Sequence, residues 1–210
     1  MELNNSFIVN RPIDEAWEIL TDLERVAPCM PGAQLTEIEG DEYRGMMKVK
    51  LGPIVTKYEG TAEFMSLDAE TRTAIIKARG RDPRQGNADA EITATLRANG
   101  RSATWVKLKT DLSLSGKVAS FGKGAIEDVS ANLLGRFSDN LEAMLSEDGT
   151  AGGGGSHPLD GRRTIDGPEA EPVDLTAVAG VPMLKRAVPI LTVVAFVGMV
   201  VWLWRHRRRR

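Results

Sequence analysis

Histidine and cysteine, the residues that build many metal sites and catalytic centres, are scarce in this sequence of 210 residues. The two histidines, His157 and His206, lie outside residues 1–146, the part of the chain with regular periodicity. This part therefore cannot form a histidine-dependent triad or an ordinary zinc site, and we expect neither catalytic residues nor a metal there. The single cysteine, Cys29, excludes an intramolecular disulfide and is expected to be a small buried hydrophobic residue.

The chain also lacks a strong excess of positive charge. The whole chain has 27 basic and 29 acidic residues, and 9 basic and 7 acidic residues follow residue 146. Residues 1–146 therefore hold 18 basic and 22 acidic residues, a net charge of −4. Such a domain matches nucleic acid poorly, so we expect no nucleic-acid partner. The N-terminus has no basic stretch followed by a long apolar core, which is the pattern of a secretory signal, and the domain is expected to be cytoplasmic.

Hydrophobic periodicity predicts one α+β domain in residues 1–146. Residues 3–9 alternate as a strand does, and apolar residues then recur at helical spacing over 13–20 and 23–27. Over 33–115 the period is two, and turn sequences rich in Gly, Pro, Asp and Asn delimit six antiparallel strands. Residues 118–145 show the strongest helical pattern. We predict a curved antiparallel sheet of about seven strands around a long C-terminal helix, with two short helices after the first strand.

The residues expected on the covered face of the sheet are unusually small. In one strand Tyr58, Gly60, Ala62 and Phe64 alternate with polar residues. Other inward positions hold Gly45, Ala74, Ala78, Gly80, Ala88, Ala90 and Ala94. These residues either leave a cavity or let the helix pack closely on a tightly wound sheet, since protein interiors normally fill to crystal-like density. We expect the cavity, which suits a lipid, polyprenyl or quinone-like ligand.

Short motifs add a family resemblance to this pattern. The order of elements resembles the helix-grip fold of START-type and Bet v 1-like (SRPBCC) proteins. Several segments are similar to the CoxG family of carbon monoxide dehydrogenase subunits. They are Pro-Cys-Met-Pro-Gly-Ala at 28–33, Lys-Leu-Gly-Pro-Ile at 50–54, Tyr-Glu-Gly at 58–60 and Ser-Phe-Gly-Lys-Gly-Ala-Ile at 120–126. The resemblance covers residues 1–145 and rests mainly on turn and packing residues.

The resemblance implies a non-catalytic accessory protein of a molybdenum-dependent carbon monoxide dehydrogenase or a related molybdenum hydroxylase. It also implies membrane association and a pocket for a hydrophobic ligand. We interpret the protein as a carrier without a covalent cofactor, which presents a respiratory quinone such as menaquinone, or a similar lipid, to the dehydrogenase for electron transfer. Two alternatives stay open: a membrane recruitment or assembly factor, and a cyclase or hydrolase whose candidate catalytic groups are Tyr43, Tyr58 and Thr110.

The predicted cavity lining combines inward strand residues with one face of the long helix. Its members have apolar, aromatic or small side chains. They are Tyr43, Met47, Tyr58, Ala62, Phe64, Ala78, Ala90, Leu108, Phe121, Ala125, Val129 and Leu133.

A membrane segment is predicted near the end of the chain. Residues 147–186 are rich in Gly, Pro and Asp without apolar periodicity, as flexible linkers are. Residues 187–204 carry no charge and are long enough for a spanning helix, and Trp202 and Trp204 suit the headgroup layer. The basic tail 205–210, which begins with Arg205 and includes Arg207, is expected to bind anionic lipid headgroups rather than nucleic acid.

The flanks of this segment leave its orientation open. A cytoplasmic domain on a spanning segment puts the tail 205–210 on the far side, yet cationic flanks prefer the cytoplasm. The segment either spans the bilayer, with its tail on outer-leaflet headgroups, or inserts shallowly and bends at Pro189. Either arrangement tethers the domain at the cytoplasmic face of the plasma membrane.

Overall fold

The computed structural model describes residues 1–51, 54–148, 163–165 and 173–174. Up to residue 148 the order is strand, short helices, six strands and a long helix, which confirms the predicted helix-grip fold. The predicted membrane segment 187–204 and the tail 205–210 lie outside the described residues, and so do Trp202, Trp204, Arg205 and Arg207. In the part that the structure describes, no helix is long and apolar enough to cross a membrane.

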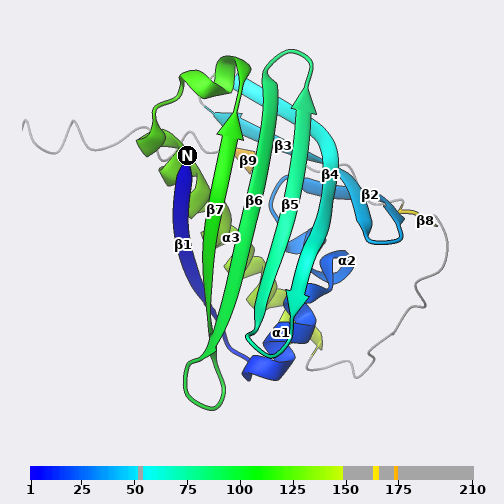
Figure 1. The fold of residues 1–210 in the computed structure, drawn as a ribbon, viewed down its shortest axis with the longest axis vertical. Helices are drawn as coiled ribbons and strands as arrows, with labels where there is room; N and C mark the ends of the chain where they lie inside the picture. Colours follow the sequence, from blue (N-terminus) through cyan, green and yellow to red (C-terminus); the bar gives the residue numbers. More distant parts are fainter. Residues whose placement is uncertain (52–53, 149–162, 166–172, 175–210) are drawn as a thin grey trace, which may run out of the picture. The chain divides into compact units, whose positions relative to one another are not determined.

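One curved sheet forms the centre of the fold (Figure 1). Its first strand, β1 (Glu2–Val9), pairs with β7 (Thr104–Leu114), the last strand of an antiparallel meander. The strands between them pair in chain order, each with the next. They are β2 (Ala33–Glu39), β3 (Glu42–Leu51), β4 (Ile54–Asp68), β5 (Thr73–Asp82) and β6 (Gly86–Ala98). Hairpins require only local pairing, so the turn residues in the sequence were sufficient to predict this order.

Two strands of two residues each lie within the predicted linker 147–186. β8 (Arg163–Thr164) pairs with β2, and β9 (Val173–Asp174) pairs with β3 in parallel. The backbone N–H of Ile165 also donates to the carbonyl oxygen of Thr36, at 2.9 Å. Segments this short carry too little alternation to be predicted as strands.

Asp82 fixes the turn between β5 and β6. Its carboxylate accepts backbone N–H groups from Arg84 at 2.8 Å and Gln85 at 3.2 Å, and from Lys57 on β4 at 2.9 Å. The residue is 7% exposed. Burial disfavours its charged form, but the three N–H donors outweigh this effect and hold the pKa of Asp82 below its ordinary value. The buried carboxylate therefore links the β5–β6 turn to β4 through the Lys57 N–H.

The short helices follow β1 and pack on the sheet. α1 (Ile13–Thr21) buries Ala16, Trp17 and Ile19, which the sequence places at helical spacing. Asp22 ends α1 and caps α2 (Leu23–Val26), because its side chain accepts the backbone N–H of Arg25. The 3₁₀ helix η1 (Ala27–Cys29) completes the segment and buries Cys29, as expected.

The long helix α3 (Lys123–Asp148) begins later than the predicted residue 118. Val118 belongs instead to the 3₁₀ helix η2 (Gly116–Ser120), and Phe121 has an extended backbone. Gly116 explains the difference: its φ is +74°, and a Cβ there would collide with the carbonyl oxygen of Gln85. The chain must therefore make a glycine turn next to the β5–β6 hairpin before the helix can start.

The C-terminal half of α3 carries the main core. Phe137, Leu141 and Leu145 are buried against β1, α1 and η1 residues, and the rings of Phe7 and Phe137 meet edge to face at 5.7 Å. Each fully buried Leu or Phe stabilises the fold by about 1.5–3 kcal/mol. Ile126 joins a second cluster with Leu3 near the start of the helix. α3 is thus anchored along β1, at one side of the sheet.

Candidate ligand cavity

A cavity of about 530 Å³ lies between the sheet and the short helices. Strands β1 to β7 all supply residues to one wall, and α1, α2 and η1 supply the wall opposite. Of the described residues of α3, Phe137 alone reaches the lining. The volume falls in the range of pockets that hold small organic ligands, about 300–1,000 Å³.

The wall of the cavity is almost entirely apolar. Most lining side chains are Ala, Leu, Val, Ile, Met, Phe or Trp. The polar residues at the wall are Thr21, Gln34, Tyr43, Tyr58, Thr61 and Arg79. No carboxylate, histidine, lysine or cysteine stands among the described residues that line it. A ligand bound here would gain its affinity from apolar burial, with hydroxyl and amide groups as its polar contacts.

A row of alanines makes the room. Ala62 on β4, Ala78 on β5 and Ala90 on β6 are direct cross-strand neighbours, so a band of methyl groups crosses the sheet. Ala74 and Ala94 form a second such pair. Because α3 packs along β1, its side chains leave the space above these bands open. Because the side chains beneath this space are short and α3 does not fill it, a cavity remains instead of a solid core.

Tyr58 and Tyr43 are the titratable hydroxyl groups of the lining. The Tyr58 hydroxyl is buried without a hydrogen-bond partner among the described residues. Burial raises the pKa of Tyr58, and the negative charge of Asp82 raises it further. Burial likewise raises the pKa of Tyr43, as do carboxylates of the short helices and the β2–β3 turn. Both phenols are therefore protonated at neutral pH and act as neutral hydrogen-bond donors.

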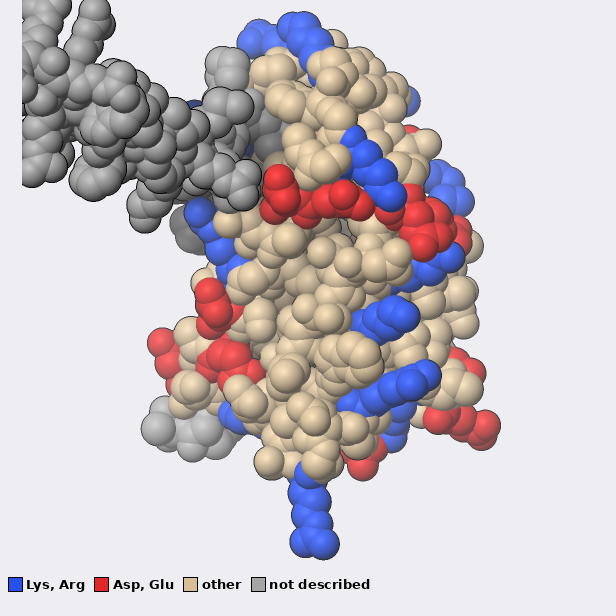
Figure 2. All heavy atoms as spheres, turned by 90° about the vertical axis from the view of Figure 1, so that its left-hand side faces the viewer, with Lys and Arg blue, Asp and Glu red and all other residues tan. Residues whose placement is uncertain are grey.

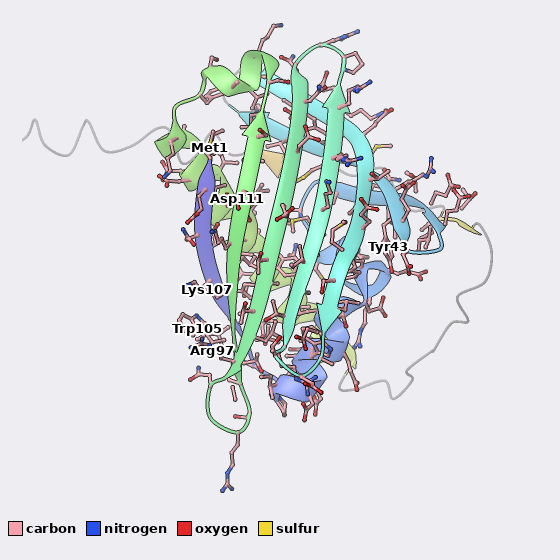
Figure 3. The ribbon with its side chains drawn as sticks, viewed as in Figure 1. Met1, Tyr43, Arg97, Trp105, Lys107 and Asp111 are labelled. Carbon is pink, nitrogen blue, oxygen red and sulfur yellow. The ribbon has the colours of Figure 1, made fainter. Side chains whose placement is uncertain are left out.

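Tyr43 marks the side of the cavity next to α2. Asp22 and Glu24 of the α2 segment are among the carboxylates that raise its pKa, and Figure 3 shows Tyr43 beside this helix. Leu20 and Leu23, which flank the junction of α1 and α2, line the same cavity and are partly exposed. Next to this junction the cavity therefore has partly exposed apolar side chains and the phenol of Tyr43.

The structure brings the strand part of the predicted site together. The following predicted residues line the cavity: Tyr43, Met47, Tyr58, Ala62, Phe64, Ala78, Ala90 and Leu108. Thr110, the third candidate for a catalytic group, does not. Whether a ligand contacts these residues stays a prediction.

The helix part of the predicted site lies elsewhere. Phe121, Val129 and Leu133 are partly buried and pack on the second core cluster, around Ile126. Ala125 is exposed. None of these four predicted residues lines the cavity.

The cavity wall formed by the short helices was missing from the predicted site. Trp17, Leu20, Leu23, Val26 and Met30 line it from α1, α2 and the segment that follows. Their helical spacing is visible in the sequence, but periodicity shows only that one face is buried. It does not show whether that face meets the core or a cavity.

Arg72 holds α1 against the sheet. It lies in the turn between β4 and β5, and its guanidinium pairs with Asp14 of α1 and stands 5.8 Å from the centre of the Trp17 ring. Its backbone has a φ of 51°, which is uncommon for a residue with a side chain. Because Trp17 lines the cavity, Arg72 fixes one wall of it from outside.

An antiparallel sheet curved against a C-terminal helix, with an apolar cavity beneath it, defines a helix-grip protein of the Bet v 1-like (SRPBCC) class. Within this class the chain belongs to the CoxG family of carbon monoxide dehydrogenase subunits, whose model matches residues 6–146. The resemblance seen in the sequence motifs is thereby confirmed. No curated protein matches the chain.

Solved structures show the same fold at low sequence identity. A conserved protein from Geobacillus kaustophilus is 19% identical, with a TM-score of 0.64 over 70% of this chain and 97% of that chain. An uncharacterized protein from Bacillus thuringiensis is 7% identical (TM-score 0.51; 69% and 99% covered). Norcoclaurine synthase from Thalictrum flavum is 14% identical (TM-score 0.50; 70% and 87% covered). At such identities the likeness concerns the fold and not the activity.

Proposed function

We propose that this protein is a non-catalytic, membrane-tethered accessory protein of a molybdenum-dependent carbon monoxide dehydrogenase. In this proposal it binds a respiratory quinone such as menaquinone and delivers it to the enzyme. The observation that carries the proposal is an apolar cavity of about 530 Å³ in a member of the CoxG family. Family membership supports the accessory role, and the cavity supports a hydrophobic cargo.

The lining suits a polyprenylated ring. The row Ala62, Ala78 and Ala90 leaves width for a planar ring, and Ile76, Ile92 and Leu108 offer apolar contacts for isoprene units. The phenol of Tyr43 is a donor for a ring carbonyl oxygen. No carboxylate stands among the described lining residues, so a positively charged cargo would leave its charge without a partner at this wall, which costs several kcal/mol.

The tether would keep the cargo domain close to the quinone pool. Residues 187–204 are the proposed membrane segment. Because β9 ends at Asp174 on the sheet, residues 175–186 join the domain to this segment, and a chain of this length reaches at most about 40 Å. A domain confined to this distance samples the bilayer surface at a high effective concentration. The dehydrogenase would then receive its electron acceptor without itself entering the membrane.

The cargo can be identified from the full-length protein purified from a host that makes quinones. Organic extracts are analysed by mass spectrometry, and the quinone is compared with the protein in moles. We expect near-stoichiometric quinone in the wild type and its loss in Ala90→Trp, which fills the cavity. Ala125→Trp is the matched control, since it adds the same side chain at an exposed position of α3 and should retain the quinone.

The control separates cargo from lipid that merely accompanies a membrane segment. Quinone present equally in Ala90→Trp and Ala125→Trp would be bound outside the cavity and would contradict the proposal. Extracts without any hydrophobic molecule, together with no uptake on titration, would leave the alternative of recruitment or assembly without ligand delivery.

A further inference from the structure

A second hollow lies on the opposite, outer face of the sheet. Its volume is about 330 Å³, and β1, β6 and β7 form it. Asn4, Thr93 and Thr95 supply amide and hydroxyl groups to it. The hollow is separate from the apolar cavity, because its residues alternate with the inward ones along each strand.

The rim of this hollow combines cations with exposed apolar side chains. Trp105 on β7 stands between Ile8 on β1 and Arg97 on β6 in the cross-strand register, and Lys107 follows two residues later. Trp105 is 44% exposed and Ile8 is 47% exposed. Figure 3 shows Arg97, Trp105 and Lys107 together near one end of the β6–β7 hairpin. We call Ile8, Arg97, Trp105 and Lys107 the basic face.

The charge of the basic face is uncompensated. Arg97 and Lys107 form no ion pair with any described residue, whereas Lys109 pairs with Glu2 at 3.0 Å. Asp111 on β7 lies opposite Glu2 on β1 and Glu91 on β6, so carboxylates occur at this position on all three strands. Figure 2 shows a band of Asp and Glu side chains across this side of the domain, with Lys and Arg side chains on both sides of the band. The acidic domain thus carries a locally cationic surface at Arg97 and Lys107.

We propose that the basic face rests on a bilayer that contains anionic phospholipid. Arg97 and Lys107 complement lipid phosphates, and the hollow between them offers Asn and Thr groups that hydrogen-bond to a headgroup. An indole beside cations is typical of the headgroup layer, where Trp105 and Ile8 would find apolar contact.

The sequence of residues 187–204 also supports a membrane partner for the basic face. This uncharged run is the proposed membrane segment, so the domain would already be close to a bilayer, and a modest attraction would then be enough to dock it. Docking by the basic face does not depend on which ligand occupies the apolar cavity. It would fix the orientation of the domain on the membrane.

A fluorophore at a single cysteine tests this in the full-length protein. Cys29→Ala is the common background, and Ser6→Cys places the label on β1 opposite Lys107, on the exposed outer face. The protein is reconstituted in phosphatidylcholine vesicles with and without phosphatidylglycerol, and quenching by nitroxide-labelled headgroups is measured. We expect quenching at Ser6 that requires phosphatidylglycerol and is lost at high salt.

Two matched controls define the outcomes. A label at Asp89→Cys, outward on β6 but at the far end of the strand, should be quenched little. In the Ser6-labelled protein, Arg97→Glu with Lys107→Glu should abolish the quenching, since each cation near an anionic surface is worth roughly fivefold in binding. Arg84→Glu with Lys117→Glu makes the same change in net charge at other exposed positions and should leave it intact.

Equal quenching at Ser6 and Asp89, or quenching that survives Arg97→Glu with Lys107→Glu, would overturn the proposal. So would an unquenched Ser6 label that becomes shielded when purified dehydrogenase is added without vesicles, since that result assigns the face to a protein partner. None of these readouts depends on quinone, so the docking proposal and the cargo proposal can fail separately.

Discussion

Gly60 on β4 lies directly opposite Gly80 on β5, with backbones so close that a Cβ on Gly60 would be 2.9 Å from the Cα of Gly80. The same Cβ would also collide with the carbonyl oxygen of Arg79. Gly45 continues the row on β3, where a Cβ would lie 2.5 Å from the carbonyl oxygen of Gln34. The glycines therefore permit close backbone approach where the sheet curves, while the alanine row leaves the cavity open.

Gly60→Ala is expected to destabilise the protein strongly, by about 3 kcal/mol, because the backbone of β5 must move to accept a methyl group. Gly135→Ala in α3 is the control: nothing lies within 4 Å of its Cβ position, and the change should stabilise the helix by about 1 kcal/mol. Urea unfolding of both variants measures the difference. A Gly60→Ala protein as stable as the wild type would show that the close approach is not required.

Tyr58→Phe should not destabilise the unliganded protein. The Tyr58 hydroxyl is buried without a partner among the described residues, and removing such a group recovers about 1 kcal/mol or more of desolvation cost. Thermal unfolding of ligand-free protein gives the comparison. If the hydroxyl instead serves the cargo, quinone affinity will fall in Tyr58→Phe while stability does not. A clear loss of ligand-free stability would contradict this assignment.

Asp82→Asn should lower stability at neutral pH by about 2–3 kcal/mol, because three backbone donors lose a charged acceptor. The pKa of Asp82 is lowered by folding, so its contribution is present above its unfolded pKa and disappears as pH falls through the folded value. The difference between wild type and variant should therefore shrink in acid. Unfolding free energies measured from neutral pH down to the acid limit test this, and a difference independent of pH would contradict it.

Arg72→Gly should be less damaging than Arg72→Ala. Both lose the contacts with Asp14 and Trp17, worth about 1 kcal/mol, since the Asp14 carboxylate is largely exposed. Alanine keeps the strain of a φ of 51°, whereas glycine adopts it freely, which should separate the two variants by about 1 kcal/mol. The ranking is read from melting temperatures. Equal stability of the two variants would mean that the turn relaxes.

The strand part of the cavity could be predicted because alternation assigns a face to every residue. Once Tyr58, Ala62 and Phe64 are placed inward, the hairpins carry the same assignment to Ala78 and Ala90. The outer hollow could not be predicted in this way. Its character depends on which residues stand side by side, such as Ile8, Trp105 and Arg97, and cross-strand register is not fixed by composition.

The helix part was misplaced for a geometric reason. Phe121 precedes α3 and does not follow its periodicity. Ala125, Val129 and Leu133 follow one another at intervals of four, and at about 100° per residue each interval turns the position by roughly 40° around the helix. Over several such steps the row passes from one face to another. Phe137, at the far end of the same row, reaches the cavity, and Ala125 faces solvent.

The pairing of β1 with β7 joins residues 2–9 to residues 104–111. Every other neighbour among strands β1 to β7 forms a local hairpin, so among these seven strands this closure carries most of the loop-closure entropy. The long helix, which packs along β1, follows β7 in the chain. During synthesis the first strand must therefore wait, unpaired, until almost the whole domain has left the ribosome, and the cavity acquires its final walls last.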